Sequence, residues 1–271
     1  MAVHETFRAL HEQGCFVIPN PWDRGTVRAL ESLGFPALAT TSAGFAFTRG
    51  APDVPGSLPV DAVLEHVAEI VSAATVPVNA DFQNGYAPDA AGVAENVRRC
   101  VQAGVAGLSI EDTGEDEAAP LFELAEAVER VRAAREAIDG TGVEVLLTAR
   151  AECFLVGHAE PLRESILRLE AYAEAGADVL YAPGVTEPAD IRAIVGAVAP
   201  KPVNVLVSRD TGLRVADLAE LGVRRVSVGS SLARVTWGAF LRAGREIAEH
   251  GTFGAFAGAA PFPELNALFG A

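Results

Sequence analysis

Residues 76–86, VPVNADFQNGY, begin as an apolar strand and end in a series of polar side chains before Gly85. A run of this kind predicts a buried strand whose carboxyl end opens at a polar mouth. Because side chains two residues apart lie on the same side of a strand, we expect Asn79 and Asp81 to point the same way. The pair could begin a site for a hard cation, or Asp81 and Asn84 could only shape a turn.

Seven further short apolar runs complete a regular series along the chain. The eight predicted strands are residues 15–19, 37–41, 76–81, 107–112, 143–150, 179–183, 202–207 and 225–229. Eight segments with helical periodicity follow them, several with proline in the first turn: residues 22–33, 59–74, 88–103, 120–138, 161–175, 187–198, 213–221 and 231–250.

Strict alternation of eight strands and eight helices predicts one closed (β/α)8 TIM barrel, which we place at residues 1–250. The alternative, an open doubly wound sheet, would need a glycine-rich turn after the first strand. The chain has PNPWD at residues 19–23 instead.

Residues 251–271 form a C-terminal extension rich in Gly, Ala, Phe and Pro, with a short helical pattern at 264–269. Its four phenylalanines are Phe253, Phe256, Phe262 and Phe269. Apolar surface of this kind seldom stays in contact with water. We expect the extension to pack on a neighbouring subunit, and the alternative is packing on its own barrel.

Composition narrows the classes of partner. The formal charge of the 271 residues is −15 and Lys201 is the only lysine, so no basic patch is available for nucleic acid. Lys201 precedes a predicted strand, which argues against Schiff-base chemistry. The longest apolar stretches are of strand length, so no membrane span is predicted.

The predicted location is the cytoplasm. Cys15, Cys100 and Cys153 are widely spaced and odd in number, which is typical of a reducing compartment. Residues 1–14 contain no long apolar run, and we expect no signal peptide there.

Carboxylates at neighbouring strand ends are the candidate site, because barrels of this type carry their chemistry at the carboxyl ends of the strands. Asp81, Glu111 and the loop residue Asp53 would face Arg150 across the mouth. Oxygen ligands suit Mg²⁺, or Mn²⁺ in its place, whereas no histidine pair favours zinc. The ion would act as a Lewis acid on a 2-oxo acid or its enolate. Alternatively, Glu111 could cap a loop and Arg150 could pair only with Glu152.

Six short motifs, in their order and spacing, resemble the isocitrate lyase and phosphoenolpyruvate mutase superfamily, which includes methylisocitrate lyase, oxaloacetate hydrolase and phosphonopyruvate hydrolase. The resemblance covers nearly the whole chain. The motifs are NPWD at 20–23, TSAG at 41–44, GAPD at 50–53, NAD at 79–81, SIED at 109–112 and TAR at 148–150.

The resemblance implies a magnesium site in which Asp81 is the direct ligand, while Asp53, Asn79 and Glu111 act mainly through waters. It also implies that Arg150 neutralises developing charge. The substrate carboxylate would be held by Ser42 and the backbone N–H groups that follow it, and the full predicted substrate-binding set is Thr41, Ser42, Ala43, Gly44, Arg150 and Asn204. The resemblance also implies a homotetramer in which neighbouring subunits exchange a C-terminal helix, and the apolar extension of this chain fits that arrangement.

Departures from the superfamily pattern concern the acid–base groups. Asn79 stands where an aspartate is usual, and Pro183 stands where a glutamate or histidine is frequent. The loop TGEDEAAP at 113–120 has neither the lysine and cysteine of the lyases nor the lysine and asparagine of the mutases. We therefore expect a divergent member, with Arg150, Glu111 and Tyr86 as the catalytic set and with Tyr86, Glu152 and Asp112 as the acid–base candidates.

The leading functional prediction is a magnesium-dependent lyase that cleaves a carbon–carbon bond of a small 2-hydroxy or 2-oxo di- or tricarboxylate, through an enolate held on the metal. One alternative is carbon–phosphorus chemistry of the phosphoenolpyruvate mutase or phosphonopyruvate hydrolase type. The other is a barrel that binds 2-oxo acids without turnover.

Overall fold

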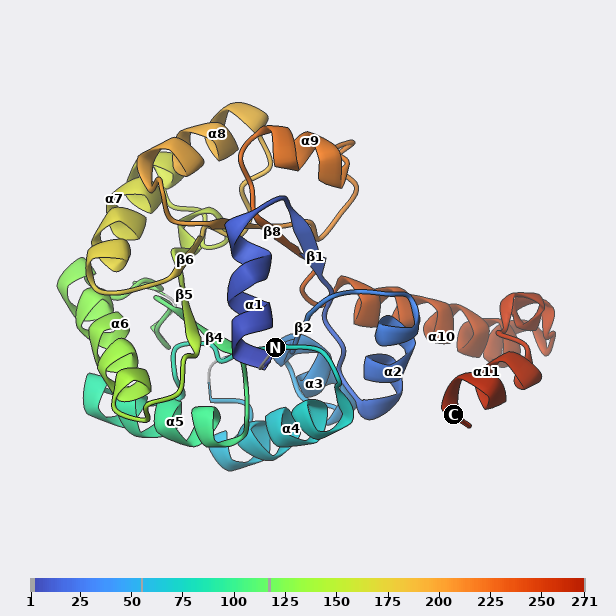
Figure 1. Cartoon of the computed structure of the whole chain (residues 1–271). Helices are drawn as coiled ribbons and strands as arrows, with labels where there is room; N and C mark the ends of the chain where they lie inside the picture. Colours follow the sequence, from blue (N-terminus) through green and yellow to red (C-terminus); the bar gives the residue numbers. More distant parts are fainter. Residues whose placement is uncertain (1–2, 55, 117, 271) are drawn as a thin grey trace.

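Eight short parallel strands form a nearly closed ring in the computed structural model, which describes residues 3–54, 56–116 and 118–270 (Figure 1). Neighbouring strands pair in sequence from β2 to β8, and β8 pairs with β1. The strands are β1 Phe16–Ile18, β2 Leu38–Ala39, β3 Val78–Asp81, β4 Gly107–Glu111, β5 Leu146–Arg150, β6 Val179–Tyr181, β7 Val203–Leu206 and β8 Arg225–Ser227. Between β1 and β2, the Ala39 N–H donates to the Pro19 carbonyl at 3.0 Å.

Helices surround this ring, so the predicted TIM barrel is confirmed (Figure 1). They are α1 Val3–Glu12, α2 Arg24–Ser32, α3 Ser42–Thr48, α4 Val60–Ala73, α5 Ala90–Gln102, α6 Leu124–Asp139, α7 Pro161–Glu174, α8 Pro188–Ala197, α9 Val215–Glu220, α10 Ser231–His250 and α11 Phe262–Phe269, with 3-10 turns η1 Glu152–Phe154 and η2 Gly254–Gly258. The helices α1 and α3 and the turn η1 were not predicted. Both α3 and η1 follow a strand directly and shape the mouth of the barrel. No helix in the described ranges is long and apolar enough to cross a membrane.

The main apolar core lies between the strands and the surrounding helices, as expected for side chains that leave the ring outward. A second cluster closes the amino end of the barrel, where Phe7 of α1 packs with Phe16 and Leu146. Phe7 is fully buried, and Figure 1 shows α1 lying across the ring. The helix α1 therefore acts as a lid on the end of the barrel opposite the strand ends that carry the polar motifs.

His11 joins α1 to β8 through one ring nitrogen, while the other contacts the backbone of its own helix. Nδ1 lies 2.8 Å from the Phe7 carbonyl, and Nε2 lies 3.3 Å from Nη1 of Arg225. The carbonyl requires a donor and the guanidinium requires an acceptor, so the ring fits this place as the neutral Nδ1–H tautomer. Burial, followed by the charge of Arg225, lowers the pKa of His11 to about 3.

The C-terminal part of the chain leaves the barrel with α10 (Figure 1). Ala233 is the buried residue of this helix, and the exposed part of the chain thus begins well before residue 251. α11 returns toward α2, where the Phe269 carbonyl accepts a 3.3 Å hydrogen bond from Arg28. Large apolar side chains nevertheless stay exposed along this arm, among them Val235, Trp237, Phe240, Leu241, Phe253, Phe256 and Phe262. Packing on a neighbouring subunit remains a prediction.

Acid should destabilise the barrel through His11. The folded pKa lies below the unfolded value of 6.5, so the unfolded chain binds the proton and stability falls as the pH drops from 6.5 toward 3. Between pH 6.5 and 4, the wild type should lose about 3 kcal/mol more unfolding free energy than His11→Gln, which cannot titrate. Urea unfolding across this range measures the difference, and parallel curves for the two proteins would contradict it.

Candidate active site

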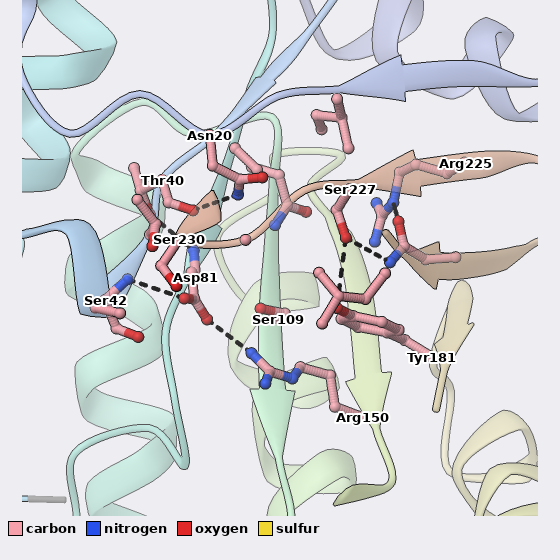
Figure 2. Close-up of a pocket in the computed structure, with 18 of the residues that line it drawn as sticks. Asn20, Thr40, Ser42, Asp81, Ser109, Arg150, Tyr181, Arg225, Ser227 and Ser230 are labelled. Atoms are coloured by element: carbon pink, nitrogen blue, oxygen red, sulfur yellow. Dashed lines mark hydrogen bonds and ion pairs between the residues drawn. The ribbon is translucent and has the colours of Figure 1, made fainter. Parts of the chain in front are cut away.

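A cavity of about 160 Å³ opens at the carboxyl ends of the strands and reaches down into the ring (Figure 2). This is many times the roughly 10–15 Å³ that one water molecule needs, so the cavity can hold a small organic molecule. Residues from all eight strand ends contribute to it: Ile18, Asn20, Ala39, Thr40, Thr41, Ser42, Ala43, Asp53, Asn79, Asp81, Ser109, Arg150, Tyr181, Asn204, Leu206, Arg225, Ser227, Gly229 and Ser230.

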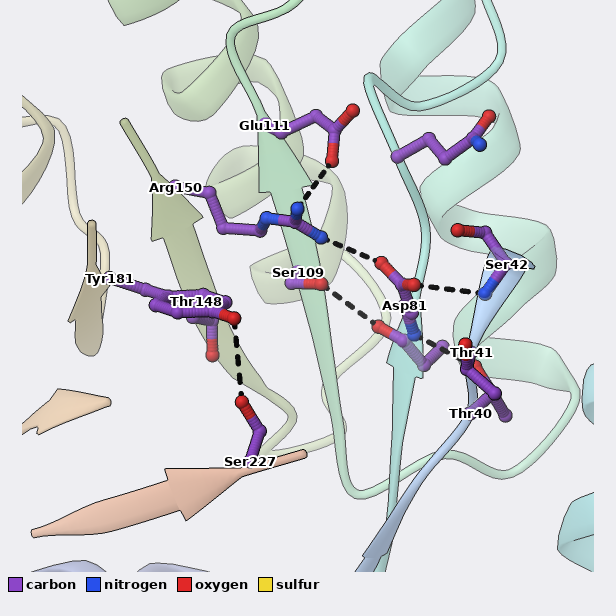
Figure 3. A network of polar contacts seen from close by, with 12 residues as sticks. Thr40, Thr41, Ser42, Asp81, Ser109, Glu111, Thr148, Arg150, Tyr181 and Ser227 are labelled. Carbon is purple, nitrogen blue, oxygen red and sulfur yellow. Dashed lines mark hydrogen bonds and ion pairs between the residues drawn. The ribbon is translucent and has the colours of Figure 1, made fainter. Parts of the chain in front are cut away.

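Arg150, at the end of β5, is the centre of the charged network at the mouth (Figure 3). Its Nη1 donates to Asp81 at 2.8 Å, and its Nη2 lies 3.0 Å from Glu111. Its Nε donates to Glu152 at 2.7 Å, and its guanidinium carbon lies 5.3 Å from the ring centre of Tyr181. Parallel strands in register bring these ends together, since Glu111 pairs with Arg150 and Arg150 with Tyr181. The predicted meeting of Asp81, Glu111 and Arg150 is thus observed.

Asp81 is held in place from the β2 side as well. The backbone N–H of Ser42, the first residue of α3, donates to Asp81 at 2.9 Å, and the Thr40 hydroxyl accepts from the Asp81 N–H at 2.8 Å. Thr41 caps α3, and its hydroxyl accepts from the Gly44 N–H at 3.1 Å. The Gly44 N–H is therefore already used within the chain. Thr41 and Ser42 line the cavity, and their binding of a substrate carboxylate stays a prediction.

Asp53 and Gln83 extend the oxygen-rich cluster to the rim. The amide of Gln83 donates to Asp53 at 3.2 Å, and the Gln83 carbonyl accepts from the Glu111 N–H at 2.9 Å. Gln83 has a φ of 40°, a left-handed backbone that turns its side chain back over the strand end. Partial desolvation, and then the nearby negative charge of Asp81, raise the pKa of Asp53.

The oxygen atoms of this cluster are of the type that a hard divalent cation binds, since they belong to carboxylates and an amide. The carboxylates also repel one another, and a cation would relieve that repulsion. Burial raises the pKa of Glu111, and Asp81 raises it further against the opposing effect of Arg150. Among the described residues, no three Asp, Glu, His or Cys side chains converge into a ready metal-binding group. Arg150 is paired with both Asp81 and Glu111, so binding of a cation to Asp81 would require the Arg150 guanidinium to give up that contact.

Asn79 and Asn204 lie in the same cavity but below the charged network. Asn79 precedes Asp81 by two residues on β3, and its amide donates to the Ala80 carbonyl at 3.1 Å. Its buried Oδ1 has no partner among the described residues. Asn204 donates to the Ser227 hydroxyl at 2.9 Å and accepts from Arg225 at 2.8 Å. The Gln83 side chain contacts the Asp53 carboxylate at the rim, whereas Asn79 lies deeper in the cavity, and its part in holding a metal ion stays a prediction.

The three acid–base candidates lie in different places. Asp112 faces the outside of the ring, where it accepts from Tyr172 at 2.7 Å, from Arg168 at 3.1 Å and from the Glu152 N–H at 2.9 Å. Glu152 is buried beside Arg150, and burial raises its pKa. Tyr86 lines a small hollow beside the cavity together with Asp53, Asp81 and Gln83.

Sequence reasoning left several polar residues out of the predicted site, among them Tyr181, Ser227, Arg225 and Gln83. Tyr181, Ser227 and Arg225 line the cavity, and Gln83 contacts Asp53. The signal for the first three was available, because residues two apart on a strand share a side and Tyr181, Ser227 and Arg225 occupy such inward positions on β6 and β8. No simple sequence signal foretells the left-handed backbone at Gln83, because glutamine rarely adopts it.

The fold and this site together define a (β/α)8-barrel enzyme with an acidic, arginine-centred cavity at the strand ends. The sequence model of phosphoenolpyruvate phosphomutase matches residues 7–248, and the chain belongs to this family, within the phosphoenolpyruvate mutase/isocitrate lyase superfamily.

Sequence relatives support that assignment. An uncharacterized protein of Mycobacterium tuberculosis is 32% identical over 83% of this chain and 82% of its own length. An oxaloacetate decarboxylase of Bradyrhizobium sp. (strain BTAi1) is 31% identical over 82% of this chain and 78% of its own length.

Solved structures agree with the fold. A protein of Burkholderia cenocepacia J2315, provisionally described as a lyase or mutase, is 46% identical with a TM-score of 0.95, over 99% of this chain and 96% of the other. A 2,3-dimethylmalate lyase is 25% identical with a TM-score of 0.85, over 99% and 95% of the two chains.

Tyr172→Phe should weaken the support behind Glu152. The substitution removes the 2.7 Å hydrogen bond to the buried Asp112, which costs about 1–3 kcal/mol of unfolding free energy. Arg163→Ala on the same helix removes an exposed ion pair with Glu160 and should cost less than about 1 kcal/mol. Chemical unfolding of both variants tests this, and equal losses would argue against a special role for the Tyr172 hydroxyl.

Proposed function

We propose that this protein is a lyase that cleaves a carbon–carbon bond of a small 2-hydroxy or 2-oxo di- or tricarboxylate with the help of Mg²⁺ or Mn²⁺. The observation that carries the proposal is the Arg150 guanidinium, held by Asp81, Glu111 and Glu152 at the cavity mouth. Relatives named 2-methylisocitrate lyase and oxaloacetate decarboxylase support carbon–carbon cleavage.

The chain's own residues supply binding and charge compensation. Arg150 has a planar fork of N–H donors suited to a carboxylate or a departing oxyanion. Asp81, Asp53, Gln83 and Glu111 would hold the divalent ion, which when bound supplies a Lewis acid where negative charge develops on oxygen. Ser42 fixes the orientation of Asp81 through its backbone N–H.

Two phenols near the mouth are proposed as proton donors. Burial raises the pKa of Tyr181 to about 12, and it raises the pKa of Tyr86 well above its usual value. Both side chains therefore keep their protons at neutral pH and can donate rather than accept. Tyr181 lines the cavity itself, whereas Tyr86 lines the adjoining hollow, so Tyr181 is the better placed.

The two phenylalanine variants separate these roles. If Tyr181 is the donor, Tyr181→Phe should lower kcat by about 10²–10⁴-fold with little change in KM, and Tyr86→Phe should leave kcat within about threefold. Steady-state kinetics on the best substrate measure both. A larger loss in Tyr86→Phe would transfer the role to Tyr86.

A panel of acids tests the reaction itself. Purified protein should form cleavage products from at least one of methylisocitrate, dimethylmalate or oxaloacetate with Mg²⁺, and chelation by EDTA should abolish turnover. Asp81→Asn should lower kcat/KM by at least about 10²-fold, because it removes the charge at the proposed metal site. The loop at residues 113–120 contains no lysine, and we expect no turnover of phosphonopyruvate by phosphorus NMR. Product from phosphonopyruvate alone would overturn the carbon–carbon proposal.

We also propose that the arm formed by α10 and α11 joins copies of the chain into a homotetramer. Trp237 and Phe240 pack edge to face with ring centres 5.7 Å apart, and both are exposed. Phe240→Glu should shift the mass measured by light scattering to a smaller species, since a charge on a buried contact is costly. The matched control, Glu249→Ala on the same helix, should keep the wild-type mass. An unchanged mass for Phe240→Glu would count against this interface.

A further inference from the structure

Arg225 is an arginine inside the barrel that has only neutral partners among the described residues. It opens β8 and is 3% exposed. Its Nε donates to Asn204 at 2.8 Å, its Nη2 donates to Thr148 at 2.9 Å, and its Nη1 lies 3.3 Å from the neutral His11 ring. No ion pair with a carboxylate is formed in the part of the chain that the structure describes.

The buried Arg130 and Arg168 and the partly buried Arg150 all have acidic partners. Arg130 pairs with Glu126, Arg168 pairs with Asp112, and Arg150 has three carboxylates. A buried charge without a counter-charge is strongly disfavoured, and folded proteins rarely keep one without a reason. Burial lowers the pKa of Arg225 to about 10, which reflects the same missing compensation.

The cavity gives an anion access to this charge. Arg225 lines the cavity together with Asn204, Ser227 and Tyr181. Figure 2 shows Asp81 and Arg150 on one side of it and Arg225 with Ser227 on the other. A guanidinium carries five N–H donors, and the three contacts above use only three of them. The two remaining N–H donors have no partner among the described residues, and two donors are what a bidentate contact with a carboxylate needs.

We infer that Arg225, assisted by Asn204 and Ser227, forms a second anion subsite deep in the ring that binds the distal carboxylate of a diacid. The inference rests on the proposed function, in which the 2-oxo acid end of the same molecule lies at Asp81 and Arg150. The subsite makes the protein selective for acids with two carboxylates, because a monoacid of equal length leaves the guanidinium uncompensated.

A competing role for Arg225 is purely structural, since it contacts His11 and so ties α1 to the barrel. The two roles differ in what they predict for ligands. If Arg225 is only structural, its loss lowers stability, and diacids and monoacids bind with equal affinity. If Arg225 is an anion subsite, its loss lowers the affinity for the diacid relative to the monoacid.

Matched ligands measure that difference. The probes are 2-oxoglutarate and 2-oxopentanoate, five-carbon 2-oxo acids that differ by a terminal carboxylate against a methyl group, with 2-oxoadipate and 2-oxohexanoate as the longer pair. Calorimetry with Mg²⁺ should show that the wild type binds the diacid of at least one pair at least tenfold more tightly. Arg225→Met should reduce this preference to about twofold or less and leave the Kd of the monoacid nearly unchanged.

Asn204→Asp provides a variant that keeps the shape of the site and does not depend on the folding of Arg225→Met. It places a carboxylate beside Nε of Arg225, at the position of the present 2.8 Å hydrogen bond, and so supplies the counter-charge from within the chain. We expect it to lose the diacid preference while its thermal midpoint stays at or above that of the wild type.

His11→Gln is the control for the structural role, because it changes the contact with α1 and His11 does not line the cavity. It should keep the diacid preference. Equal binding of both acids by the wild type, or a preference that survives in Asn204→Asp, would overturn the subsite and leave the proposed lyase standing. A wild type that binds none of the four acids in the presence of Mg²⁺ would overturn the subsite, and the lyase would fall as well if the panel of acids also gave no product.

Discussion

Charge balance around Arg150 is the constraint on which the mouth of the barrel depends. Three carboxylates, Asp81, Glu111 and Glu152, face one guanidinium, which leaves two negative charges uncompensated when all three are ionised. Such a cluster is stable only with further positive charge, protons, or both. Burial raises the pKa values of Glu111 and Glu152, so protonation can remove part of the negative charge. A divalent cation would balance that charge instead. This charge imbalance is what the proposed function uses, since a divalent cation bound there would compensate the carboxylates.

The sequence was sufficient for those parts of the fold and site that follow from periodicity. Apolar runs of strand length, separated by amphipathic helices, predicted all eight strands, and the rule that chemistry lies at strand ends brought Asp81, Glu111 and Arg150 together. Because neighbouring residues on a strand point to opposite faces, only one of Glu111 and Asp112 can face the cavity, and that residue is Glu111. Asp112 is accordingly outside the ring with Arg168 and Tyr172, and it acts as a support for the backbone of Glu152.

Tertiary placement decided the rest, and the sequence carries little information on it. Gln83 joins Asp53 because of a left-handed backbone, and α3 begins directly after β2 because Thr41 caps it. The sequence does not predict the direction of α10 either. Its periodic apolar face predicts burial, but the surface that covers this face need not belong to the same chain. A helix that starts at the barrel and then leaves it has the same sequence pattern as one that packs along it.

The interior of the ring differs from that of most (β/α)8 barrels, because polar side chains occupy inward positions from the mouth of the cavity to its floor. Barrels of this type commonly fill their interior with branched aliphatic side chains, whereas here Asn79, Thr148, Asn204 and Arg225 occupy inward positions. Polar groups inside a barrel are disfavoured unless they are satisfied. Among the residues that the structure describes, Arg225 has no counter-charge and Asn79 Oδ1 has no donor. The cavity is thus anionic at its mouth and cationic at its floor. In the proposed function, a divalent cation held by the carboxylates and the distal carboxylate of a small diacid at Arg225 would compensate both.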